Sequence, residues 1–113
     1  MTTASIFQDL EYNASKPMIK VLLETTFTKE IRIAMQEGTA MAKHQTPFPI
    51  VIEIVEGRIA FGVEGEVLDL KKGDLIALDG GVPHDLNAKE NSIVRLTLTK
   101  SDEVKRVKKV INN

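Results

Sequence analysis

Two histidines, His44 and His84, are the side chains with the widest chemical range in this chain of 113 residues. Near neutral pH an imidazole can accept or donate a hydrogen bond, carry a proton, or bind a divalent metal. The chain has no cysteine, which excludes disulfides, thiolate metal sites and a cysteine nucleophile. No Ser-His-Asp set, Gly-rich phosphate loop or zinc-protease motif accompanies the histidines. The available chemistry therefore depends on whether the two imidazoles meet.

The segment 73–84 predicts how His84 is positioned. It contains a turn, a short apolar strand at 75–78, a second turn with Gly80 and Gly81, and then His84 directly after Pro83. Glycine and proline are typical of such turns, and proline fixes the local backbone. We therefore expect His84 to begin a new strand and to face a pocket, with His44 as its partner.

Alternating apolar and polar residues predict short strands over most of the chain. At 50–55, for example, Ile50, Ile52 and Ile54 share one face, and Glu53 falls on the other. Glu64 and Gly65 fit a two-residue hairpin loop, in which glycine supplies the positive φ. Short strands separated by frequent turns indicate an all-β sandwich or barrel. The expected strands are 19–23, 30–35, 39–46, 50–55, 59–63, 67–70, 75–78, 83–87 and 92–99.

The chain is long enough for one domain, with a barrel core at about 18–99. Residues 1–12 form an N-terminal extension, and apolar residues at helical spacing predict one or two helical turns within 4–12. A short surface helix is predicted at 101–111, with Val104, Val107 and Ile111 on one side.

Charge and hydropathy exclude several classes of partner. The chain has 15 basic and 16 acidic residues. Charges this closely balanced produce no electrostatic field that would attract nucleic acid or a membrane surface. We find no signal peptide and no apolar run of about 20 residues, the length that a membrane helix needs. We therefore expect a soluble, cytoplasmic protein.

Two sequence motifs resemble those of the cupin superfamily, specifically the small single-domain type-2 cupins. The first cupin motif has an opening glycine, two histidines separated by one residue, a glutamate and a closing glycine. Here Gly38, His44 and Gly57 match the opening glycine, the first histidine and the closing glycine. Thr46 stands at the second histidine position and Ile50 at the glutamate position.

The second cupin motif matches at Gly73, Gly81 and His84. Asp79 stands at its proline position and Ala88 at its asparagine position. The resemblance covers about residues 30–99 and implies a jelly-roll barrel, also called a double-stranded β-helix.

The resemblance also bears on metal binding. Family members that bind a metal present three histidines and a glutamate to Fe, Mn, Ni, Zn or a similar ion. This chain keeps His44 and His84, whereas Thr46 is a feeble ligand and Ile50 is none. Glu53 is no substitute, because alternation points it to the face opposite Ile50. At most, we expect a weakly held divalent metal at His44 and His84.

Three functions stay open. The first is a non-catalytic small-molecule-binding or sensing module with a degenerate metal site, and the second is a metal-dependent enzyme of the oxygenase or isomerase type. The third is an interaction module resembling the sensory half of a regulator. In any of them the histidines could instead be cavity residues that only donate hydrogen bonds to neighbours. The candidate pocket residues are His44, Thr46, Ile50, Ile52, His84, Met35, Met41 and Phe48.

A homodimer is expected for two reasons. A short barrel leaves edge strands, and the apolar run at 19–23 exceeds what one domain covers. The family resemblance also implies a homodimer.

Overall fold

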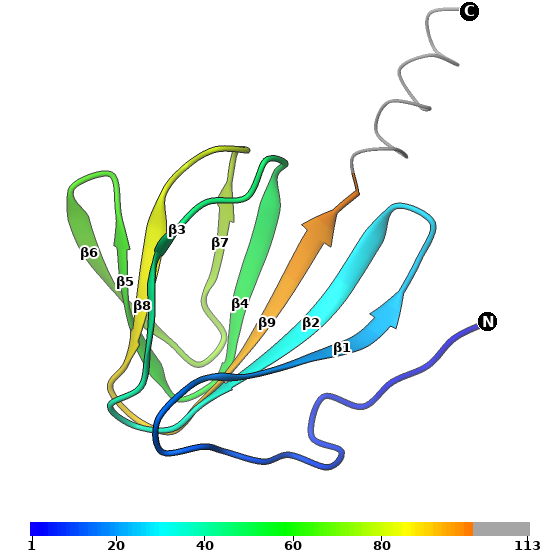
Figure 1. The fold of residues 1–113 in the computed structure, drawn as a ribbon, viewed down its shortest axis with the longest axis horizontal. Helices are drawn as coiled ribbons and strands as arrows, with labels where there is room; N and C mark the ends of the chain where they lie inside the picture. Colours follow the sequence, from blue (N-terminus) through cyan, green and yellow to red (C-terminus); the bar gives the residue numbers. More distant parts are fainter. Residues whose placement is uncertain (101–113) are drawn as a thin grey trace, which may run out of the picture.

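The computed structural model describes residues 1–100, and this part of the chain is all-β (Figure 1). Two antiparallel sheets face each other, with strand orders β1-β2-β9-β4-β7 and β3-β8-β5-β6. This arrangement confirms the predicted double-stranded β-helix. The strands are β1 (Met18–Glu24), β2 (Thr28–Met35), β3 (Ala40–His44), β4 (Ile50–Glu56), β5 (Arg58–Val63), β6 (Glu66–Lys71), β7 (Leu75–Leu78), β8 (His84–Ala88) and β9 (Ser92–Thr99).

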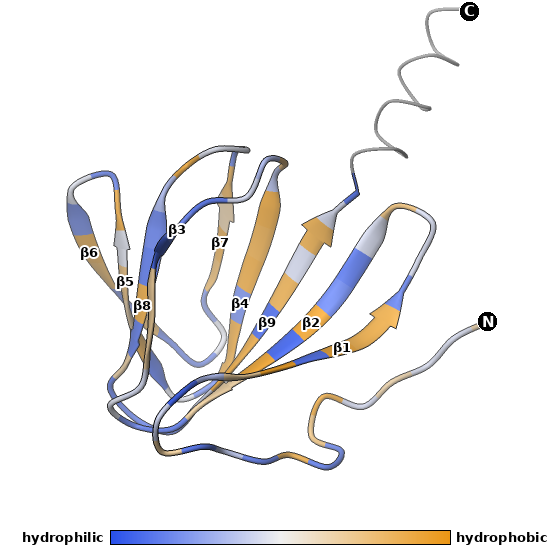
Figure 2. Ribbon diagram, viewed as in Figure 1, coloured by the Kyte–Doolittle hydropathy of each residue, from blue (hydrophilic) through white to orange (hydrophobic). Residues whose placement is uncertain are grey.

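The core lies between the two sheets and is built by alternating residues. Ile50, Ile52 and Ile54 of β4 share one face, as predicted, and are buried there, whereas Val51 is exposed. Phe61 of β5 is fully buried and lies in the same apolar cluster. Figure 2 shows the same alternation of apolar and polar residues along β2 and β9. The apolar faces of the two sheets thus pack against each other in the interior of the barrel.

The hairpin between β5 and β6 has the predicted two-residue loop. Both Glu64 and Gly65 have positive φ, at 51° and 77°. These values match a type I′ turn, which suits the twist of a β-hairpin. The turn holds Glu64 at the tip of the hairpin.

The N-terminal segment contains a turn at 6–9 in place of the predicted helical turns. Arg32 of β2, only 4% exposed, donates from Nη1 to the carbonyls of Ile6 and Gln8, each at 2.8 Å, and from Nη2 to that of Asp9 at 3.3 Å. A helix would direct these carbonyls along its own axis. The helix prediction for 4–12 was therefore wrong, because these carbonyls accept hydrogen bonds from the distant Arg32 guanidinium.

The predicted helix at 101–111 lies outside the described residues. Within residues 1–100, no helix has the length and apolar character needed to cross a membrane.

The five-stranded sheet extends past its partner at β1, which lies at its outer edge (Figure 1). Ile19 pairs with Ile33, and Val21 pairs with Ile31, so all four side chains share the core face of the sheet. Ile33 and Ile31 are buried, but Ile19 and Val21 stay 61% and 49% exposed. The apolar face of the sheet is thus wider than the core of one chain.

Candidate functional site: a histidine pair in the barrel

The structure brings the two histidines together on neighbouring strands. His44 ends β3, His84 begins β8, and the two residues are direct partners in the antiparallel ladder. Their ring centroids are 4.4 Å apart, with the ring planes tilted by 59°. The loops that follow β3 and precede β8 are also joined, since Gly81 N donates to Thr46 O at 2.7 Å. The prediction that His44 and His84 lie next to each other is confirmed.

Each imidazole is oriented by a backbone carbonyl two residues earlier. His44 Nδ1 lies 2.8 Å from Ala42 O, and His84 Nδ1 lies 2.9 Å from Val82 O. A carbonyl oxygen can only accept a hydrogen bond, so Nδ1 of each ring carries the proton and donates it. In the neutral rings both Nε2 atoms then keep a lone pair. These atoms can accept hydrogen bonds from a ligand or bind a cation.

The surroundings of the pair are apolar on one side and open to solvent on the other. His84 is 2% exposed and stacks on Phe61, with centroids 5.6 Å apart and planes 10° apart. Val63 is the ladder partner of His84 on β5. His44 is only half-buried. A molecule approaching from the His44 side would meet one accessible imidazole and then one enclosed imidazole.

The other side chains near this end of the barrel do not complete a metal centre. Thr46 Oγ1 donates to Phe48 O at 3.1 Å, and Ile50 is an apolar core residue. Among residues 1–100, no group of three or more His, Cys, Asp and Glu side chains gathers in one place. Stable zinc sites use three or four protein ligands. The donor set therefore does not fit the three-histidine and one-glutamate centre implied by the family resemblance.

Glu53 lies on the outer face of the barrel, as the alternation of β4 predicts. Its Oε1 accepts from Arg95 Nε at 3.0 Å, and Arg95 Nη1 also donates to Glu30 Oε1 at 3.0 Å. Because the guanidinium holds Glu53 there, this carboxylate has a structural role.

Other ion pairs also lie on exposed surfaces. Arg58 Nε donates to Asp69 Oδ1 at 2.7 Å, and this hydrogen bond lowers the pKa of the Asp69 carboxyl. A similar hydrogen bond from Lys100 lowers the pKa of the Glu24 carboxyl. Both carboxylates therefore form ion pairs on the protein surface.

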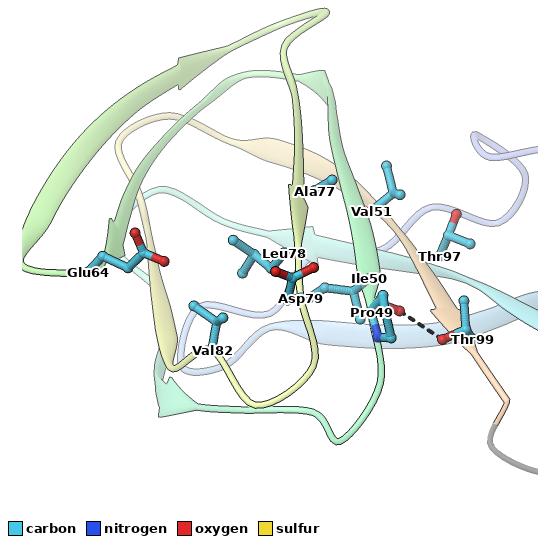
Figure 3. A pocket seen from close by; sticks show the side chains of 10 residues that line it. All are labelled: Pro49, Ile50, Val51, Glu64, Ala77, Leu78, Asp79, Val82, Thr97 and Thr99. Atoms are coloured by element: carbon cyan, nitrogen blue, oxygen red, sulfur yellow. Dashed lines mark hydrogen bonds between the residues drawn. The ribbon is translucent and has the colours of Figure 1, made fainter. Parts of the chain in front are cut away.

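The remaining predicted pocket residues lie at different depths. Met35 and Ile52 belong to the closed core, Met41 is partly buried against it, and Phe48 is half-buried in the loop between β3 and β4. A groove of about 280 Å³ lies instead at the ends of β4, β7 and β9 (Figure 3). Ile50 lines this groove but neither histidine does. Sequence reasoning missed the groove, although Asp79, at the proline position of the second motif, lies in its lining.

Two facing antiparallel sheets form the jelly-roll architecture that cupins share with several other families. A family model described as a cupin domain matches residues 31–99. The chain belongs to the cupin domain family.

Solved structures with the same fold share little sequence with this chain. An RmlC-like cupin protein from Desulfovibrio desulfuricans is 17% identical, with a TM-score of 0.80 over 88% of this chain and 96% of its own. A Klebsiella pneumoniae protein with a double-stranded β-helix domain is 19% identical, with a TM-score of 0.76 over 88% and 89%. KdgF from Halomonas sp. is 22% identical, with a TM-score of 0.66 over 76% and 81%. At these identities the likeness concerns the fold alone. No curated protein matches the chain.

Proposed function

We propose that this cupin is a non-catalytic small-molecule-binding or sensing module, and that the histidine pair holds the polar end of its ligand. The observation that carries this proposal is the pair of Nδ1 contacts to Ala42 O and Val82 O, which leaves both Nε2 atoms as acceptors. A complementary ligand presents two adjacent donors, such as a primary amide, an amine or a diol. Val63, the half-buried ladder partner of His84, favours an apolar group beside those donors.

A metal-dependent enzyme is the second candidate, and the same contacts favour it. Metal-bound histidines usually donate their other ring N–H to a carbonyl or carboxylate, as both rings do here. Among residues 1–100, the lack of a third and fourth protein ligand weighs against a tightly held ion. Metal content therefore separates the two candidates.

Replacing His84 by phenylalanine tests the binding proposal. Phenylalanine keeps a ring to stack on Phe61 but removes both nitrogens. We expect a fragment set of small amides, amines and diols to contain binders that raise the melting temperature of the wild-type protein. Their affinity should fall at least about tenfold in His84→Phe, the value of one or two hydrogen bonds.

Asp69→Asn is the matched control, because Asp69 is an exposed residue paired with Arg58 on β5. This variant should bind the same fragments with unchanged affinity. Fragment binding that survives in His84→Phe would contradict the proposal. Stoichiometric metal in protein purified without chelators, lost in His84→Phe, would favour the enzyme instead.

We also propose that two copies associate through β1. Ile19 and Val21 extend the apolar core face beyond the opposing sheet, and β1 is an edge strand of its sheet. A second copy would cover both the side chains and the edge. Light scattering at micromolar concentration should give twice the 12.5 kDa mass of one chain.

The double variant Ile19→Glu/Val21→Lys should shift this mass to that of a single chain, because it places charges on the apolar face without changing net charge. Val67→Glu changes an exposed valine on β6 and should leave the mass unchanged. A wild-type protein with the mass of one chain would refute association through β1.

A further inference from the structure

The groove at the ends of β4, β7 and β9 has an apolar lining, and Val51 and Ala77 in that lining lie outside the barrel core. Val51 and Ala77 lie opposite each other on the outer face of the sheet. Leu78, which is buried in the core, and Val82, which packs against the core, also line the groove. Figure 3 shows Glu64 at one side of the groove and Thr97 and Thr99 at the other. The groove therefore runs from the β5–β6 hairpin tip to the last residues of β9.

The charges along the groove are all negative. Glu64 and Asp79 both line it, and both are exposed. Within residues 1–100, neither carboxylate takes part in an ion pair. A complementary occupant would be an apolar segment with basic side chains.

The chain itself carries such a segment next to the groove. Thr99, the last residue of β9, lines the groove and is followed after one residue by 101–113. The apolar residues Val104, Val107 and Ile111 recur at helical spacing in this segment. Its basic residues are Lys105, Arg106, Lys108 and Lys109.

We propose that residues 101–113 dock in this groove of their own chain. The apolar side of the segment covers Val51 and Ala77, and its basic side chains approach Glu64 and Asp79. Covalent attachment favours this occupant, because a short tether holds a segment at an effective concentration of about millimolar.

Docking would also bring the segment into contact with the loop that orients His84. Val82 lines the groove, and its carbonyl accepts the hydrogen bond from His84 Nδ1. The docked segment would therefore contact one support of the histidine pair. Docking itself does not depend on what the histidines bind.

Disulfide trapping in the full-length chain tests the docking, since the protein has no cysteine of its own. In one variant, Ala77→Cys is combined with Val107→Cys. In its control, Val107→Cys is combined with Val67→Cys, an exposed position on β6 that does not line the groove. With diamide as oxidant, we expect the first pair to form an intrachain disulfide at least tenfold faster. Pairing Ala77→Cys with Val104→Cys or Ile111→Cys then locates the segment along the groove.

Charge reversal supplies a second readout. Adding Glu64→Lys and Asp79→Lys to the first cysteine pair should slow its oxidation severalfold at low salt, with a smaller effect at high salt. Equal oxidation rates for the two cysteine pairs would overturn the proposal. A disulfide between two chains would overturn it too, because a second copy would then occupy the groove.

Discussion

Gly57→Ala is expected to lower the free energy of unfolding by about 3 kcal/mol or more, combining a strained backbone with overpacking. Gly57 has a φ of 90°, and a Cβ there would lie 2.7 Å from Ser92 Cα and still closer to Ser92 Oγ and Asn91 O. Ser92 cannot move freely. It is fully buried, and its Oγ accepts from Arg58 N at 3.0 Å and lies 2.8 Å from Glu90 O. Urea unfolding followed by circular dichroism measures the loss.

Gly65→Ala is the matched control for this effect. Gly65 also has a positive φ, of 77°, but a Cβ there would meet no atom within 4 Å. Only the cost of the left-handed backbone remains, about 1–2 kcal/mol. Equal losses in the two variants would show that contact with Ser92 contributes nothing.

The double variant Thr46→His/Ile50→Glu is expected to convert the histidine pair into a metal centre. Without metal it should be several kcal/mol less stable than wild type, because Ile50 is 2% exposed and a carboxylate there is buried without a partner. With excess Zn²⁺ it should regain most of that stability, since three imidazoles and one carboxylate can then share the ion. Urea unfolding with and without Zn²⁺ measures both effects, and calorimetry should give an affinity at least about 100-fold above wild type, the value of two further ligands.

Adding His84→Phe to the double variant is the control, because it removes one of the two original imidazoles. The stabilisation by Zn²⁺ should then be largely lost, and a chelator should reverse it in the parent variant. A double variant that gains nothing from Zn²⁺ would show that positions 46 and 50 do not converge on His44 and His84.

Most strands could be predicted from the sequence, because alternation reports directly which side chains face the core. The last strand was predicted at 92–99, and β9 has these bounds. The strand predicted at 39–46 ends earlier, at His44. Its ladder is already irregular between Met41 and His44, and Pro47 and Pro49 lack the N–H that would continue it.

The site was predictable in part. Motif spacing indicated that His44 and His84 would meet, since both lie where a strand meets a turn. The groove was not predictable, because Glu64 and Asp79 come from different turns and line the same groove only after the sheets close. Arg32 shows the same limit. Its carbonyl partners lie more than twenty residues away, and no local pattern marks them.

The adjacency of His44 and His84 has a practical consequence for spectroscopy. They are the only two imidazoles in the chain, and their ring centroids are 4.4 Å apart. Protein labelled with ¹⁵N only at histidine would therefore give side-chain signals from this end of the barrel alone. Those signals distinguish the two ring tautomers, so one sample serves as an internal reporter of hydrogen bonding and occupancy at the pair.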